Sequence, residues 1–189
     1  MRKLTYYIGM TIDGFIAAPD GAAEFFPVTQ DVIDFIRDDY PDMLPTHVRP
    51  QFGLDDGNRD FDTVVQGRVT YEPALEIGVT SPYAHMRQYV VSRSIDGSPD
   101  PAVEIVTGDV LAKIRELKAE DGKGIYLAGG ARLAGALLPE IDELVIKLYP
   151  VVAGSGIPLF TADFSPAYFE LTGTRVLDSG MVVLTYARK

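Results

Sequence analysis

The sequence contains no cysteine and only two histidines, and these absences exclude several kinds of chemistry. Without cysteine there is no disulfide, no thiolate nucleophile and no cysteine-based zinc site. His47 and His85 are the only imidazoles that could bind a metal ion, so we expect no metal centre. The Walker A phosphate loop, the HExxH zinc motif, the GxSxG nucleophile elbow and the Rossmann GxGxxG between a strand and a helix are also absent.

Basic residues and long apolar runs are scarce as well. The chain has 17 Lys and Arg against 27 Asp and Glu, a net charge of −10, which repels nucleic acid and anionic membranes. The apolar runs are short, and the N-terminus enters a strand pattern without the features of a signal peptide. We therefore expect a soluble cytoplasmic protein with a small-molecule partner, in which a few arginines and helix N-termini would hold any phosphate.

The 189 residues predict one α/β domain in which strands alternate with helices. β-Branched and aromatic runs predict strands at 3–10, 61–67, 88–92, 103–107, 124–130, 143–152, 168–177 and 181–187. Helical spacing of apolar residues predicts helices at 29–39, 69–77, 110–120 and 131–138, with Asp109 as an N-cap and Pro139 as a stop. We expect a mostly parallel sheet, covered on both faces and closed by a C-terminal antiparallel hairpin. Residues 41–61 form a long irregular loop, either a lid or a mobile insertion.

Three predicted strand ends carry groups suited to phosphate. Gly67-Arg68-Val69-Thr70 opens a helix after the second of these strands, and Ser92-Arg93 follows the third. Gly129-Gly130-Ala131-Arg132-Leu133 opens a helix where a diphosphate could approach the backbone. The alternative is that the glycines only form tight turns and the arginines are solvated. Gly154-Ser155-Gly156 predicts a tight turn, because Pro158 blocks a following helix.

Taken in order, these sites resemble the dihydrofolate reductase superfamily, in particular its bacterial branch related to the C-terminal reductase domain of riboflavin biosynthesis. Four segments of the sequence carry the resemblance, which covers nearly the whole chain: MTIDGFIA at 10–17, GRVTYE at 67–72, GG at 129–130 and GSGIPLF at 154–160. The resemblance implies a three-layer αβα dihydrofolate-reductase-like fold over residues 1–189.

The same resemblance implies a cofactor and the residues that bind it. The implied cofactor is NADPH, and the implied activity is that of an NADPH-dependent oxidoreductase that transfers a hydride to a small pterin-like or ribosylaminopyrimidine-like heterocycle. Its NADPH-binding residues would be Ile16 and Ala17 beside the nicotinamide, Gly67, Arg68, Thr70, Ser92 and Arg93 at the adenosine end, and Gly129, Gly130, Ala131, Arg132 and Leu133 at the diphosphate. It also implies a homodimer.

Two carboxylates are candidates for the proton donor that such a reduction needs. Asp31 lies early in the helix that precedes the Gly67-Arg68 strand, as the substrate acid does in dihydrofolate reductases. It lies at the edge of an apolar stripe that includes Phe35, and partial burial there would raise its pKa. Asp13 is a second candidate on the substrate side, and Asp13 and Phe35 are the residues expected to bind the substrate. The alternatives are a first-turn carboxylate favoured by the helix dipole for Asp31 and an Asp-Gly turn residue for Asp13.

Departures from the family pattern limit what can be said of the substrate. The chain has no tryptophan to cover a pterin, and Ala134 stands where many dihydrofolate reductases have a tyrosine. Lys147 stands near the position of a threonine that bonds the acid, so either Lys147 points outward or the site is differently charged, which would favour an anionic substrate. Nothing resembles the deaminase of the bifunctional riboflavin enzymes. The alternatives to a reductase are a non-catalytic NADPH-binding or dinucleotide-binding module and a structural protein.

Overall fold

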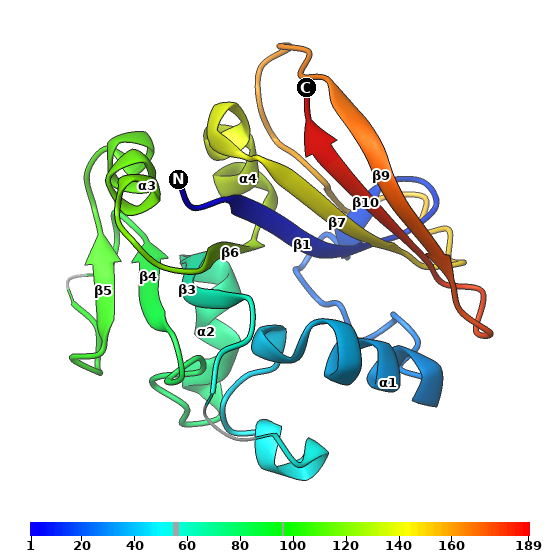
Figure 1. Ribbon diagram of the computed structural model, residues 1–189, viewed down its shortest axis with the longest axis horizontal. Coiled ribbons are helices and arrows are strands. Elements are labelled where there is room, and N and C mark those ends of the chain that lie inside the picture. Colours follow the sequence, from blue (N-terminus) through cyan, green and yellow to red (C-terminus); the bar gives the residue numbers. More distant parts are fainter. Residues whose placement is uncertain (55–56, 96) are drawn as a thin grey trace.

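A computed structural model describes residues 1–54, 57–95 and 97–189 and shows one central sheet of eight strands (Figure 1). Their order across the sheet is β5-β4-β3-β6-β1-β7-β10-β9. The bounds are β1 Leu4–Met10, β3 Phe61–Gly67, β4 Arg87–Val91, β5 Val103–Val106, β6 Gly124–Gly129, β7 Glu143–Leu148, β9 Phe169–Val176 and β10 Val182–Arg188. The eight expected strands are thus confirmed within a few residues.

The first six strands across the sheet are parallel, and the last two close it in the antiparallel sense. β1 pairs in parallel with β6 and β7, and β3 pairs in parallel with β4 and β6. β10 runs antiparallel to β7 and to β9, as the absence of a helix between the last two strands predicts. Because all six parallel strands run in one direction, their carboxyl ends meet at one edge of the sheet.

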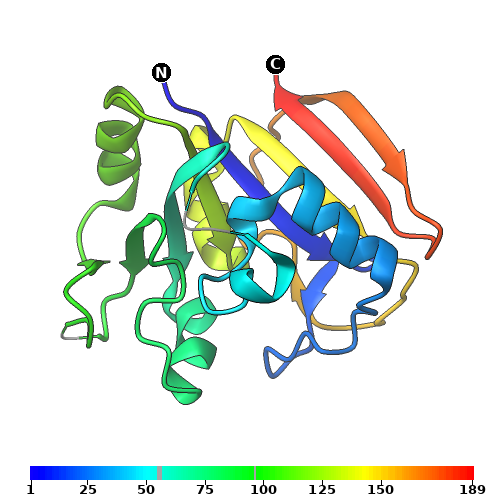
Figure 2. The same cartoon turned by 60° about the horizontal axis from the view of Figure 1, so that its bottom comes forward.

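Four helices cover the two faces of the sheet (Figure 2). The helices α1 Gln30–Asp39 and α2 Arg68–Glu76 lie on one face, while α3 Val110–Ala119 and α4 Ala131–Leu137 lie on the other. α1 buries Val32 and Phe35, and Asp109 caps α3 by accepting a hydrogen bond from the backbone N–H of Ala112 at 3.1 Å. The three-layer αβα fold is confirmed.

The structure differs from the expectation in two short strands and in the 41–61 segment. β2 Phe15–Ala17 and β8 Ile157–Pro158 form a small antiparallel pair that is too short to give a sequence pattern. Among the described residues of 41–61, the segments Pro41–Met43 and Arg49–Phe52 are 3-10 helices, and Phe61 already belongs to β3. Asp55 and Asp56 lie outside the described residues.

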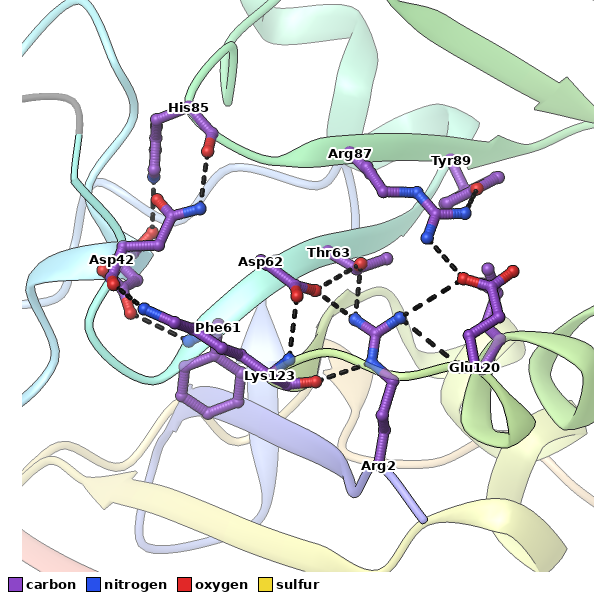
Figure 3. Close-up of polar contacts among 12 residues, drawn as sticks. Arg2, Asp42, Phe61, Asp62, Thr63, His85, Arg87, Tyr89, Glu120 and Lys123 are labelled. Carbon is purple, nitrogen blue, oxygen red and sulfur yellow. Dashed lines mark hydrogen bonds and ion pairs between the residues drawn. The ribbon is translucent and has the colours of Figure 1, made fainter.

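A network of polar side chains joins the amino ends of the parallel strands (Figure 3). The buried guanidinium of Arg2 donates to the Lys123 carbonyl at 2.6 Å and to the Thr63 hydroxyl at 2.6 Å, and it also pairs with Asp62. Glu120, at the end of α3, accepts a hydrogen bond from Arg87 at 2.5 Å. These contacts tie the starts of β1, β3, β4 and β6 together.

Asp42 anchors the irregular segment to the same end of the sheet (Figure 3). Its carboxylate is buried and accepts hydrogen bonds from the backbone N–H groups of Arg59, Asp60 and Phe61 at 2.6–3.1 Å. The ring of His85 lies 3.0 Å from the Asp42 carbonyl oxygen. The segment is thus held at its two ends by buried hydrogen bonds.

Candidate functional site at the carboxyl ends of the strands

The glycines predicted to bind a diphosphate lie next to one another at the carboxyl ends of β3 and β6. A Cβ added to Gly67 would lie 3.5 Å from the Gly129 carbonyl oxygen and 3.7 Å from the Gly130 nitrogen. A Cβ added to Gly130 would lie 3.9 Å from the Thr70 hydroxyl. Gly129 has a φ of +109°, which disfavours other residues, and the Gly129–Gly130 peptide is cis. Side chains at these positions would fill the narrow space between two strand ends, which the glycines leave open.

The residues expected beside the nicotinamide form a small apolar cluster next to these glycines. Ile16, Ala17 and Ala131 are buried against one another, so β2 meets the first turn of α4. β2 is held by β8, and Gly156 is required there because its Cβ would lie 2.3 Å from the Ala17 carbonyl oxygen. Packing therefore explains the glycine at 156, and residues 154–156 form a bend where the sequence predicts a turn.

Asp13 ties the loop before β2 to that turn. Its carboxylate accepts hydrogen bonds from the Thr11 hydroxyl at 2.6 Å and from the backbone N–H groups of Ala153 and Gly154 at 3.1 and 2.7 Å. These bonds, the one from Thr11 above all, lower the pKa of Asp13 to about 2. Asp13 therefore orders the loop as an ionised carboxylate, and its substrate contact stays a prediction.

The predicted arginines are exposed at the strand ends and differ in their contacts. Arg68 forms an ion pair with Glu72 at 2.5 Å, one turn further along α2. Arg93 and Arg132 are exposed and make no ion pair with the described residues. Ser92 is buried and its hydroxyl accepts from the N–H groups of Ser94 and Ile95 at 3.1 Å, so it shapes the turn that presents Arg93. Leu133 is buried in the core under α4.

The structure contradicts the expected rise in the pKa of Asp31. Its carboxylate accepts hydrogen bonds from the Thr29 hydroxyl, the Val32 N–H at 3.0 Å and the Ser179 N–H at 2.8 Å. These contacts, led by Thr29, lower the pKa to about 2. The expectation was wrong because the hairpin between β9 and β10 supplies a hydrogen-bond donor from 148 residues away along the chain, which the helical pattern does not reveal. Asp31 is thus ionised at neutral pH and connects α1 to the hairpin.

Phe35 lies in the core rather than in an open substrate site. Its ring is buried beneath α1, and the Arg175 guanidinium lies 5.3 Å from its centre. One edge reaches a cleft of about 400 Å³ between α1 and the hairpin, which Arg175 and Asp39 line while they pair with each other. A contact between Phe35 and a substrate stays a prediction. None of the residues that line this cleft belongs to the glycine-rich strand ends.

Lys147 points to the α1 face of the sheet, which resolves the alternative that the sequence leaves open. It lies opposite Gly9 of β1 and Val183 of β10, and its Nζ lies 4.3 Å from the centre of the Tyr7 ring. Burial lowers the pKa of Lys147 to about 8. Tyr7 belongs to a group of tyrosines on this face that the sequence pattern did not reveal. The Tyr7 ring contacts those of Tyr40 and Tyr126, Tyr126 contacts Tyr83, and Tyr149 lies in the same core cluster.

A second, smaller cleft of about 200 Å³ begins at the carboxyl end of β3. Gln66, Thr70 and Tyr83 are among its lining residues, so it adjoins the glycines described above. Gln66 is buried, and its amide nitrogen has no hydrogen-bond partner among the described residues. Sequence analysis missed Gln66 because a polar residue in a buried parallel strand stands out only when the strand's neighbours are known.

Two searches of the described residues concern other kinds of site. Residues 1–54, 57–95 and 97–189 include no group of three or more histidine, aspartate or glutamate side chains placed to hold a metal ion. Within the same ranges, no helix has the length and apolar character needed to cross a membrane.

The strand order and the glycine-rich strand ends define an α/β protein with a candidate binding site at the carboxyl edge of its sheet, and comparison with known proteins gives the family. Residues 2–183 match the RibD C-terminal domain, and the chain belongs to this family. It is 33% identical to the protein YwjB of Bacillus subtilis (strain 168) over 189 residues, which cover 99% of this chain and 98% of that protein.

Two solved structures share the fold. One is a dihydrofolate reductase from Enterococcus faecalis complexed with NADP(H), with 16% identity, a TM-score of 0.66 and coverage of 99% of this chain and 96% of that chain. The other is a diaminohydroxyphosphoribosylaminopyrimidine deaminase/5-amino-6-(5-phosphoribosylamino)uracil reductase from Thermotoga maritima, with 15% identity and a TM-score of 0.67. The whole of this chain covers 57% of that one. At these identities, both likenesses concern the fold.

Proposed function

We propose that the protein is an NADPH-dependent reductase that transfers a hydride to a small heterocyclic substrate. One observation carries the proposal: the strand order sets the predicted cofactor residues side by side in the order in which the parts of a dinucleotide are joined. Arg93 follows β4, Arg68 follows β3, the paired glycines follow β6, and Ile16 and Ala17 follow β1, its neighbour. The two phosphate-binding arginines would hold the 2′-phosphate and the glycines the diphosphate.

The local geometry fits such a cofactor. The diphosphate needs close approach to the backbone, and the gap between Gly67 and Gly129–Gly130 is one that side chains would fill. The nicotinamide needs an apolar wall, which Ile16 and Ala17 supply. When bound, NADPH would supply the hydride, and the chain's own residues would orient both reactants.

A titration followed by cofactor fluorescence tests the proposal. Wild-type protein should bind NADPH more tightly than NADH, because a 2′-phosphate adds charge-assisted hydrogen bonds to arginine. Equal affinities, or no binding of either, would contradict it. A non-catalytic dinucleotide-binding module would bind NADPH but would not oxidise it, whichever heterocycle was added.

We also propose a homodimer that forms through β9. This strand is an edge of the sheet, and Tyr168, Leu171 and Val176 on or beside it are exposed by 73%, 52% and 69%. An apolar sheet edge in water favours pairing with a second copy. Light scattering should give twice the chain mass for wild type and a smaller mass for Leu171→Glu. A monomeric wild type at micromolar concentration would contradict the proposal.

A further inference from the structure

Lys147 is a cation that the fold leaves without a counter-ion. Among the described residues, the Lys147 ammonium has no carboxylate at ion-pair distance and no hydrogen-bond acceptor. Its electrostatic contact is with the face of the Tyr7 ring. No charged neighbour perturbs it, since burial alone accounts for its lowered pKa. A partly buried ammonium without a partner is costly to the folded state, so its presence calls for an explanation.

Two more polar groups on the same face also lack partners. The Tyr7 hydroxyl and the Gln66 amide nitrogen are both buried and have no hydrogen-bond partner among the described residues. Tyr7 lies opposite Val145 and Gly9 lies opposite Lys147 in the β1–β7 pair, so the side chains of Tyr7 and Lys147 point to the same face. Gln66 follows Val64 by two residues in β3, and Val64 packs in the core on the α1 side, so Gln66 also points to that face. Lys147 and Gln66 each lie one residue before the end of their strand.

These groups suit an electron-rich ring better than a cationic one. Lys147 offers N–H donors, Tyr7 offers an O–H, and the rings of Tyr7, Tyr40 and Tyr126 supply flat apolar surface, whereas Gln66 lies on β3, three strands away from β7. Gly9 lies opposite Lys147 and has no side chain. The Tyr149 ring packs close to Gly9, since a Cβ added to Gly9 would lie 3.1 Å from that ring. The candidate acid Asp31 is ionised and accepts a hydrogen bond from the hairpin, so it has no proton to donate at neutral pH.

We propose that the Lys147 ammonium is the cationic group that contacts the hydride-accepting ring and donates the proton that completes its reduction. The inference rests on the proposed function. A hydride from the reduced nicotinamide adds to the carbon of a C=N or C=O group, the π electrons move to the nitrogen or oxygen, and that atom takes a proton from Nζ. Lys147 is left as a neutral amine, which water reprotonates. The site therefore binds neutral or anionic rings and rejects protonated ones.

The contact can be tested without the true substrate by using two ring probes of opposite charge. Orotate, a planar pyrimidine carboxylate, should bind the wild-type protein more tightly than 2,4-diaminopyrimidine in its protonated form. Lys147→Met should weaken orotate at least tenfold, and Lys147→Arg should restore part of the loss. Lys3→Met is the matched control, because it removes the same charge from an exposed residue at the opposite end of the sheet. NADPH affinity should stay the same in all three variants.

A second readout follows the amine directly. Reductive methylation with ¹³C-formaldehyde labels the lysine amines, and the NMR resonance that is missing in Lys147→Arg is that of Lys147. This resonance should titrate at lower pH than the resonance of Lys3. Its titration midpoint should move to higher pH when orotate is bound. Orotate affinity that is undetectable, or equal in wild type and Lys147→Met, overturns the proposal, as does a Lys147 resonance that ignores orotate. Because orotate binding and the titration of the Lys147 amine are measured without cofactor, their failure is distinguishable from a failure to bind NADPH, which would contradict the proposed function instead.

Discussion

The two ends of the parallel sheet treat their buried polar groups in opposite ways. At the amino ends, Arg2 and Asp42 are almost fully buried, and each makes several hydrogen bonds to named partners. Lys147 and Gln66 near the carboxyl ends, together with Tyr7 in the middle of β1, are left without hydrogen-bond partners among the described residues. Both ends are polar, so polarity by itself does not mark a functional site. The difference is that the first set stabilises the chain, whereas the second costs stability and is available to a ligand.

Asp42→Ala should have the largest effect, because it removes a hydrogen-bond acceptor at the amino ends of the strands, where the buried polar groups are paired. It leaves the backbone N–H groups of Arg59, Asp60 and Phe61 without their acceptor inside the protein, which should cost about 3–5 kcal/mol of unfolding free energy. Urea denaturation measures the loss. The NADPH affinity of the folded molecules, after correction for the unfolded fraction, should be unchanged. A loss of that affinity beyond this correction would contradict a purely structural role for Asp42.

Lys147→Met should have the opposite sign and stabilise the protein. A pKa of about 8 in place of 10.5 corresponds to a penalty of about 3 kcal/mol below pH 8. Loss of the contact with Tyr7 offsets up to about 1 kcal/mol of the gain, which leaves about 2 kcal/mol.

The pH dependence of that gain checks its cause. Between about pH 8 and 10.5 the unfolded amine holds its proton and the folded one does not, so wild-type stability rises with pH. The advantage of Lys147→Met should therefore be full below pH 8 and shrink as the pH approaches 10.5. A variant that is less stable than wild type at neutral pH would show that Lys147 is a structural residue.

Arg68→Ala should weaken NADPH binding by about 1.5 kcal/mol, the low end for hydrogen bonds to charged groups. The effect is reduced because Arg68 must exchange its ion pair with Glu72 for the 2′-phosphate. NADH affinity should change little. Glu72→Ala is the matched variant, since it frees Arg68 and should tighten NADPH slightly. Equal losses for NADPH and NADH in Arg68→Ala would place Arg68 elsewhere on the cofactor.

Asp31→Asn should have the smallest effect and separates the two candidate proton donors. Because hydrogen bonding lowers its pKa to about 2, the ionised carboxylate stabilises the fold above its unfolded pKa, and that contribution is lost as the pH falls toward 2. The variant should lose some stability at neutral pH, and its difference from wild type should vanish in acid. Turnover with any accepted heterocycle should persist, whereas a hundredfold loss would make Asp31 the acid.

Most of the predictions about the cofactor-binding residues came from the family resemblance rather than from composition. Gly67, Arg68, Thr70, Gly129 and Gly130 were identifiable because each follows a strand directly, so the local chain suffices to place them at one edge. The substrate side was not identifiable in this way. Asp31 looked like a half-buried acid until Ser179 was found to bond it, and Gln66 and Tyr7 looked like ordinary strand residues.

The sequence by itself determined the strands, the helices, the α/β class and the family, because periodicity, capping residues and turn glycines act over a few neighbouring positions. Only the tertiary structure decided which buried polar groups are satisfied. The strand register places the Lys147 side chain on the sheet face that α1 covers rather than on the opposite face. The hairpin near the C-terminus donates a hydrogen bond to the Asp31 carboxylate and so favours its ionised form. Both outcomes depend on contacts between residues more than a hundred positions apart, which no local pattern encodes.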